Sequence, residues 1–159
     1  MNLRRSSVVA AAILFASMAF ALGASSSTAS KSSLNLTLAG SANGSSVAGK
    51  VQFGTVMCAP LSGQGLQVNW NGSAKTGSKT QQVSGSFQFS TTGRSTFGPH
   101  GTATATLVIG GNYSNSLGSG VSGGGGKGSV AANRKSGSAN VTVVSGSSKV
   151  RENGSWVCG

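Results

Sequence analysis

Apolar and polar residues alternate along most of the chain after residue 33. The clearest runs are 34–38, 66–70 and 87–89, where every second residue is Leu, Val, Trp or Phe. A period of two places successive side chains on opposite faces of a β-strand, one toward a core and one toward water. Trp70 alternates with Val68 in this way, so we expect it in the core. The many glycines argue against helices, and the pattern predicts an all-β fold.

The number of such runs predicts the architecture. Shorter runs of the same kind occur at 51–53, 102–109, 141–143 and 156–158. Together they give about seven strands, which is typical of an antiparallel sandwich or barrel. We therefore expect a single antiparallel β-sandwich, or a barrel, over residues 34–159.

Glycine-rich segments predict where the chain turns. Asn-Gly is a strong hairpin signal, because both residues tolerate positive φ. It occurs at 43–44, 71–72 and 153–154. We expect the last pair to fold 149–152 back on 155–158. Residues 114–129 are so rich in Gly and Ser that they predict a long loop between two strands.

The first 23 residues have the features of a secretory signal peptide. Arg4 and Arg5 precede a largely apolar run over 8–20, which ends near an A-x-A cleavage site. This run is shorter than the roughly 20 residues that a membrane-spanning helix needs. We expect a cleaved signal over 1–23, a polar tail over 24–33 and no membrane span after cleavage. The mature protein would be secreted and extracellular, periplasmic or bound to the cell surface.

The chain has two cysteines, Cys58 and Cys158. In an exported protein an even pair most simply forms one disulfide. Two cysteines and one distant histidine make a poor ligand set for zinc. The sequence therefore predicts a Cys58–Cys158 disulfide and no metal site.

The charge of the chain is strongly positive because acids are missing. There are 12 Lys and Arg and one acidic side chain, Glu152, so the formal net charge is +11, or +9 without Arg4 and Arg5. The basic residues are scattered along the mature sequence, and Arg134 and Lys135 are the one adjacent pair. Nucleic-acid-binding proteins concentrate basic side chains and interleave aromatic ones. The scatter disfavours nucleic acid and leaves other anionic polymers as partners.

Missing carboxylates also change the expected response to acid. Acid unfolds proteins mainly by protonating carboxylates that are paired in the native state. With one Glu and a terminal carboxylate, stability is expected to be nearly flat between about pH 2 and pH 6.

The same lack of carboxylates excludes several mechanisms. One Glu and no Asp cannot supply the paired carboxylates of glycosidases or aspartic proteases, or the ligands of a calcium or magnesium site. His100, the only histidine, lies in the turn-like sequence GPHG and is expected to be a turn residue. We therefore expect no catalytic residue, no cofactor and no enzymatic activity.

Residues 117–129 (LGSGVSGGGGKGS) resemble phosphate-binding loops. They contain the spacing G-x-G-x-x-G, and Gly126-Lys127 looks like the end of a nucleotide-binding loop. Such a loop needs Gly six residues before its Lys and Ser or Thr after it, whereas this chain has Val121 and Gly128 there. The dinucleotide motif also needs a following helix, which a run of glycines does not open. We interpret the tract as a mobile loop with Lys127 as a charge contact.

Polar surface residues are the remaining candidates for function. Gln67, Asn69 and Asn71 would line one face of a strand, and Gln52 and Gln88 could join them. Four candidate surface contacts are Tyr113, Lys127, Arg134 and Lys135.

The expected function is that of a secreted, non-enzymatic β-sandwich module, a structural or adhesive component of the cell surface or extracellular matrix. The alternative is a module that binds carbohydrate or an anionic envelope, with a cell-surface polysaccharide or another anionic polymer as partner. Strand edges with few charges also leave self-association open.

Overall fold

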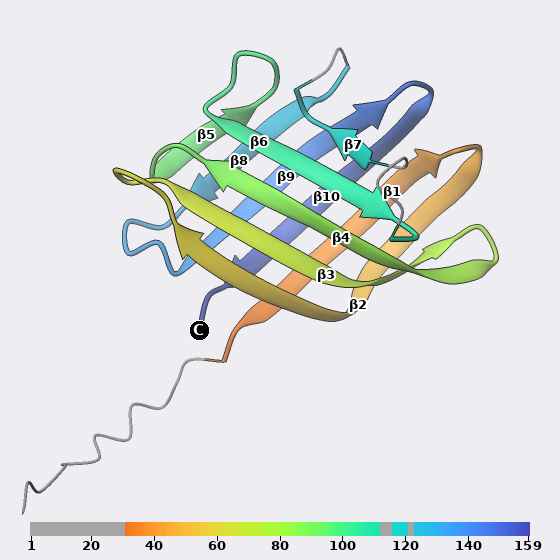
Figure 1. Ribbon diagram of the computed structural model, residues 1–159, viewed down its shortest axis with the longest axis horizontal. Coiled ribbons are helices and arrows are strands. Elements are labelled where there is room, and N and C mark those ends of the chain that lie inside the picture. Colours follow the sequence, from red (N-terminus) through yellow and green to blue (C-terminus); the bar gives the residue numbers. More distant parts are fainter. Residues whose placement is uncertain (1–30, 112–115, 121–122) are drawn as a thin grey trace, which may run out of the picture.

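The computed structural model describes residues 31–111, 116–120 and 123–159. Within them the chain forms ten β-strands and no helix (Figure 1). The strands are β1 (Ser33–Ala42), β2 (Ser45–Pro60), β3 (Leu66–Thr76), β4 (Lys79–Phe89), β5 (Gly93–Phe97), β6 (Ala103–Ile109), β7 (Ser116–Gly118), β8 (Gly125–Val130), β9 (Ser136–Ser145) and β10 (Ser148–Val157). Among these residues, therefore, no helix is long and apolar enough to cross a membrane. The predicted signal peptide and most of the polar tail lie outside the described residues.

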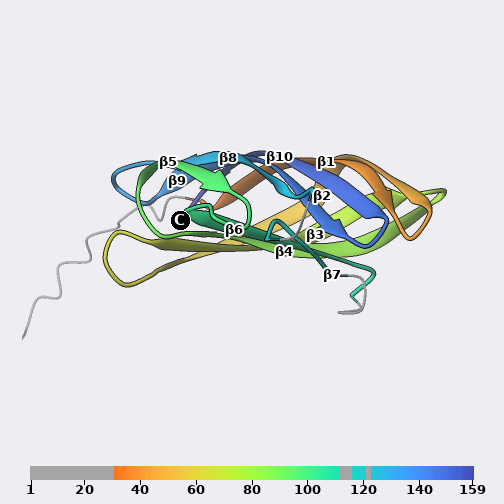
Figure 2. The same ribbon diagram turned by 90° about the horizontal axis from the view of Figure 1, so that it is seen from above.

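The ten strands form one sheet that closes on itself. Pairings run in the order β10-β1-β2-β3-β4-β6-β5-β8-β9, and β9 pairs again with β10. The short β7 pairs with β6 and β9. Figure 2 shows the closed sheet flattened into two layers, with β3, β4 and β6 in one and β1, β5, β8, β9 and β10 in the other. The all-β prediction is confirmed. The prediction of about seven strands in a sandwich is wrong, because the layers belong to one continuous ten-stranded sheet.

β2 carries the sheet from one layer into the other. Its register against β3 shifts between Ala48 and Gln52 and again between Gln52 and Thr55. Gly49 and Phe53, which lie within these shifts, have φ of 105° and 52°. Such bulges bend a strand and increase its twist. The bend explains why a chain with sandwich-like strand patterning keeps a single sheet.

The bend leaves one gap in the ring of strand pairing. The ladder between β1 and β2 ends at the pair Thr37–Lys50, so 33–36 pair with β10 alone and 51–60 with β3 alone. The side chain of Leu34 packs against the backbone of β2 here, since a Cβ on Gly54 would lie 2.8 Å from Leu34 Cδ2.

The predicted disulfide is confirmed and lies beside this gap. Cys58 in β2 is bonded to Cys158, which directly follows β10, across a sequence separation of 100 residues. The backbone N–H of Cys158 also donates to the Lys135 carbonyl oxygen at 2.7 Å. The disulfide therefore joins the two layers where strand pairing does not.

Each of the two tryptophans lies directly across from a glycine on the next strand. Trp70 in β3 is paired with Gly85 in β4, and Trp156 in β10 is paired with Gly137 in β9. A Cβ on either glycine would collide with the indole opposite. Both tryptophans are 2% exposed, which confirms the core position expected for Trp70.

The tryptophans belong to an aromatic cluster that holds the layers together. Phe87 of β4 stacks on Trp156 of β10 with ring centroids 5.4 Å apart, and it also contacts Trp70 at 6.3 Å. Phe89 and Phe97 complete the cluster, with their ring centroids 5.4 Å apart. Aromatic pairs at such distances contribute about 0.5–1.5 kcal/mol beyond the area that they bury.

The glycine tract is a strand where the sequence predicted a loop. Within 114–129, residues 116–118 form β7 and residues 125–129 belong to β8, which pairs with β9 over its whole length and with β5 over 126–130. Gly128 faces the core, and a Cβ there would lie 2.8 Å from the ring of Phe97 and 3.0 Å from that of Phe89. Glycine is used here because the aromatic rings need the space, so the loop prediction is wrong for these segments.

Two of the three Asn-Gly turns are also absent. Asn43-Gly44 forms the turn between β1 and β2, but β3 runs straight through Asn71-Gly72 and β10 through Asn153-Gly154. A Cβ on Gly154 would meet the Asn35 carbonyl oxygen of β1. Glycine at these two positions permits a close approach of neighbouring segments, and the predicted hairpin between 149–152 and 155–158 is wrong.

The glycine opposite Trp156 should be essential for stability. Gly137→Ala places a methyl group against a buried indole and the Ser129 carbonyl, so we expect it to lower the free energy of unfolding by about 2 kcal/mol or more. The matched control is Gly120→Ala, where no atom lies within 4 Å of the new Cβ; it should change stability by less than about 1 kcal/mol. Urea denaturation of both variants measures the difference. Equal stability of the two would contradict the packing role.

The disulfide should contribute strongly because it closes the gap. In the chain-entropy model a bridge over this separation stabilises by about 4–5 kcal/mol. Reduction should therefore lower the unfolding midpoint, and amide exchange should speed up first in residues 51–60. The Cys58→Ala/Cys158→Ala double variant should be destabilised and insensitive to reductant. Exchange that accelerates uniformly over the sheet would argue against a local closure.

Candidate functional site

Outward side chains of β5, β8, β9 and β10 form one polar surface. The strand register aligns them in cross-strand rows. One row is Thr96, Lys127, Asn140 and Asn153, and the next is Arg94, Ser129, Ser138 and Ser155. We call this surface, together with Lys149 and Arg151 of β10, the basic face.

Four cations cross the basic face diagonally. Arg94 of β5 and Lys127 of β8 are diagonal neighbours, a relation that places Cβ atoms about 7–8 Å apart. Arg151 of β10 lies diagonal to Asn140 and donates from Nε to Asn140 Oδ1 at 2.8 Å. Lys149 follows two residues away on the same side of β10. We call Arg94, Lys127, Arg151 and Lys149 the cationic stripe.

The basic face is hollowed around the first two cations. A shallow depression of about 820 Å³ is lined by Arg94 and Lys127 with hydroxyl and amide side chains from four strands. The other polar side chains that line it are Thr96, Thr102, Ser129, Ser138, Asn140 and Asn153. We call it the basic hollow. Cations interleaved with neutral hydrogen-bonding groups can hold an anionic ligand that also carries hydroxyl groups.

No acidic side chain offsets the stripe. Glu152, the only acid, points into the core, is 0% exposed and has no hydrogen-bond partner for either carboxyl oxygen. Removal of the carboxyl from water raises the pKa of Glu152 well above its usual value. The surface cations of the described residues therefore have no acidic side chain to pair with, and their positive potential is free to attract an anion.

The outer surface of β3, β4 and β6 differs from the basic face. Its central rows are Gln67, Gln88 and Thr104; Asn69, Ser86 and Thr106; and Asn71, Ser84 and Val108. These side chains carry no charge. The predicted alignment of Gln67, Asn69 and Asn71 on one face, joined by Gln88, is confirmed, and Gln67 Nε2 donates to Asn69 Oδ1 at 3.1 Å. Gln52, which was expected to join them, lies on β2 opposite Ser73, between the two register shifts of that strand. We call the outer surface of β3, β4 and β6 the neutral face.

The structure separates the predicted contact residues. Lys127 lies in the basic hollow. Arg134 and Lys135 lie between β8 and β9, where Arg134 Nη1 donates to the Gly63 carbonyl at 3.4 Å and so links two loops. Tyr113 lies outside the described residues.

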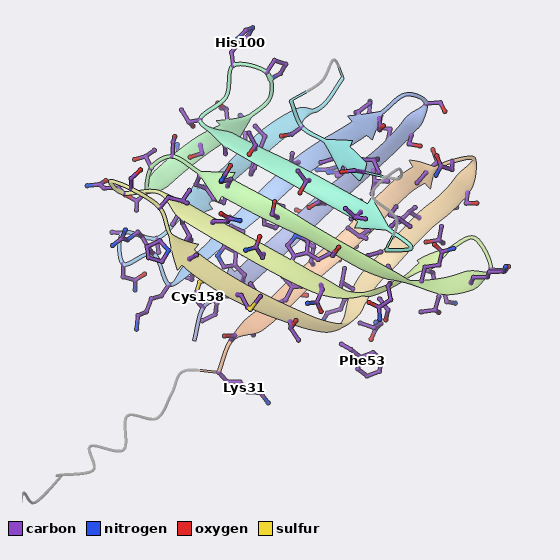
Figure 3. All side chains as sticks on the ribbon, in the orientation of Figure 1. Lys31, Phe53, His100 and Cys158 are labelled. Carbon is purple, nitrogen blue, oxygen red and sulfur yellow. A yellow bond between two sulfur atoms is a disulfide. The ribbon has the colours of Figure 1, made fainter. Side chains whose placement is uncertain are left out.

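Two exposed residues stand apart from both faces. Figure 3 shows His100 at the tip of the β5–β6 turn and Phe53 pointing away from β2. Phe53 is 91% exposed although the alternation at 51–53 placed it beside Val51, which is buried. The bulge in β2 turns the Phe53 side chain outward. Glycines within a strand, here Gly49 and Gly54, are the one local signal of such a bulge.

The described residues contain no cluster of side chains that could ligate a metal ion. In the described ranges, no group of three or more His, Cys, Asp or Glu side chains lies together. The cysteines of those ranges are both in the disulfide.

Comparison with known proteins gives no guide to the site. No protein-family model, curated protein or solved structure matches the chain. The roles proposed for individual residues therefore follow from the geometry of the site.

Sequence reasoning missed Arg94, Arg151, Asn140 and Asn153. Each is a polar outward residue of a strand in the structure. The sequence predicted no strand around Arg94, and it placed Asn153 in a hairpin turn and Arg151 in an arm of that hairpin. Their clustering depends on the register between strands that are far apart in sequence, and the sequence carries no direct signal of that register.

The buried Glu152 should make stability depend on pH. Because its pKa is raised in the folded state, the folded protein binds the proton more tightly than the unfolded chain does. Stability is then greatest below the unfolded pKa of about 4.3 and falls as pH rises through the folded pKa. Stability is therefore not flat over the whole range from about pH 2 to pH 6, as the sequence predicted, but begins to fall above about pH 4.3.

Thermal unfolding at pH 4 and pH 8 measures this effect, with a higher midpoint expected at pH 4. Glu152→Gln removes the ionisable proton at nearly the same side-chain volume and should abolish most of the difference. Its midpoint at pH 8 should exceed that of the unchanged protein. A difference that persists in Glu152→Gln would assign the pH dependence to other groups.

Proposed function

We propose that the protein is a non-enzymatic extracellular module that binds anionic polysaccharide on its basic face. The observation that carries the proposal is the cationic stripe, which crosses hydroxyl- and amide-bearing strands on a surface without an exposed acidic side chain. Attachment to such a polymer is how a module of this kind would act as an adhesive or structural component of a cell surface.

The chemistry of the face favours a sugar polymer over nucleic acid. Binding of single-stranded nucleic acid typically uses exposed aromatic rings on which bases stack. Here Trp70 and Trp156 are buried, and the one exposed aromatic among the large hydrophobic residues of the described ranges, Phe53, lies on β2. Ser, Thr and Asn side chains around Arg94 and Lys127 instead match a ligand with both carboxylate or sulfate groups and hydroxyls.

The extent of the site across four strands also suits a chain-like ligand. The basic hollow extends over β5, β8, β9 and β10, and all of its lining residues except Thr102 lie in these strands. A site built on paired strands loses little conformational freedom on binding, since its backbone is already ordered. The stripe continues past the hollow to Arg151 and Lys149, so successive charges of a polymer could each meet a cation.

Loss of two cations from the hollow should weaken binding far more than loss of two cations elsewhere. The test compares Arg94→Ala/Lys127→Ala with Lys75→Ala/Lys79→Ala, which removes the same charge from the β3–β4 hairpin. Charge-assisted hydrogen bonds contribute about 1.5–3 kcal/mol each, so the first variant should bind polygalacturonate at least about tenfold more weakly. The second should stay within about threefold, an effect of net charge alone.

The measurement is calorimetry or co-sedimentation at low salt, repeated at raised salt. Binding by the unchanged protein should weaken as salt screens the charges. Equal losses in the two variants would show that net charge and not the basic face decides binding. Tighter binding to single-stranded DNA than to the polysaccharide, lost in Arg94→Ala/Lys127→Ala, would replace the proposed ligand class with nucleic acid.

A further inference from the structure

A second hollow adjoins the basic one and has a different chemistry. It has a volume of about 450 Å³, and its lining contains no charged side chain. Its polar lining side chains are Ser62, Gln88, Ser90, Thr102 and Thr104. Gln88 of β4 lies directly across from Thr104 of β6, at one end of the neutral face. We call it the neutral hollow.

Thr102 lines both hollows and is held between them. The backbone N–H of Thr96, in the basic hollow, donates to Thr102 Oγ1 at 3.4 Å. Ser90, in the neutral hollow, donates to the Thr102 carbonyl oxygen from its hydroxyl at 2.8 Å and from its backbone N–H at 3.0 Å. The two hollows are therefore neighbours separated by one ordered, exposed residue.

Thr102 lies at the edge where the chain passes from β5 in one layer to β6 in the other (Figure 2). β5 and β6 are joined by a single bridge, Phe97 to Ala103, and the chain between them turns at 98–102. Ligands that follow the strands on one layer would stop at this edge. A polymer that bends around Thr102 passes from the basic hollow directly into the neutral one.

The two hollows suit different sugar units of one chain. Arg94 and Lys127 provide charged donors for a carboxylate or sulfate. In the neutral hollow, the Gln88 amide and the Ser and Thr hydroxyls offer both donors and acceptors to the hydroxyls of an uncharged sugar, and the half-buried Leu61 offers an apolar contact. A charged sugar in the neutral hollow would lose hydration with no cation among the lining residues to compensate.

We propose, as an extension of the proposed function, that the ligand is a heteropolysaccharide in which anionic and neutral sugars alternate. An anionic unit lies in the basic hollow at Arg94 and Lys127, the chain passes over Thr102, and a neutral unit lies in the neutral hollow against Gln88 and Thr104. Specificity for the mixed polymer then comes from the neutral hollow, while the stripe provides most of the affinity.

The test compares two polymers and two glutamine variants of the mature protein. Hyaluronan, in which glucuronate alternates with N-acetylglucosamine, represents the mixed class, and polygalacturonate represents the purely anionic class. Gln88→Ala removes the amide of the neutral hollow. Gln82→Ala removes another exposed amide on the same side of β4, away from that hollow.

We expect the unchanged protein to bind hyaluronan more tightly than polygalacturonate at equal uronate concentration. Gln88→Ala should weaken hyaluronan binding roughly fivefold, as expected for loss of neutral hydrogen bonds, and leave polygalacturonate unchanged. Gln82→Ala should change neither.

The outcomes separate this inference from the function on which it rests. If Arg94→Ala/Lys127→Ala weakens both polymers but Gln88→Ala weakens neither, or both equally, the alternating ligand is wrong and the anionic site stands. Preference of the unchanged protein for polygalacturonate would likewise overturn the inference. If neither polymer responds to Arg94→Ala/Lys127→Ala, the proposed function fails and the extension fails with it.

Discussion

The packing of each tryptophan over the glycine across from it determines how closely the strands and layers can approach. Trp70 lies over Gly85 in one layer and Trp156 over Gly137 in the other, and Phe87 contacts both indoles across the core. Any side chain at the glycines would displace an indole that has no free space to move into. The two matched pairs therefore set how closely β3 approaches β4 and how closely β9 approaches β10.

This core explains the unusual surface. The interior takes nearly all large apolar side chains of the described residues and also the only acid, Glu152. Both indole N–H groups and the Glu152 carboxyl have no hydrogen-bond partner there, an arrangement that costs free energy and that aromatic packing must offset. What remains outside is a surface of hydroxyls, amides and unpaired cations. The positive charge of the basic face thus has two causes: the cations lie on the surface, and the only acidic side chain lies in the core.

Much of the fold follows from local pattern, and the failures share one cause. The alternation of apolar and polar residues at 34–38, 66–70 and 87–89 correctly predicted strands there and which side chains of each strand are buried. Asn-Gly at 153–154 and the glycine tract at 114–129 were interpreted as turn and loop signals. In the structure Gly154 and Gly128 instead lie where neighbouring segments or aromatic rings come close. A glycine permits both a turn and a close approach, and sequence spacing does not distinguish the two.

The sequence by itself determined the all-β class, the inward face of most strands, the single disulfide and the lack of paired carboxylates, because each depends on residue type or on a period of two. The tertiary structure alone decided that Arg94, Lys127, Arg151 and Lys149 lie in one stripe and that Thr102 lies between two hollows of different chemistry. Both depend on the register between strands distant in sequence and on the bend in β2. Register is set by the packing of the whole closed sheet, since a shift of one residue would expose every buried side chain of a strand.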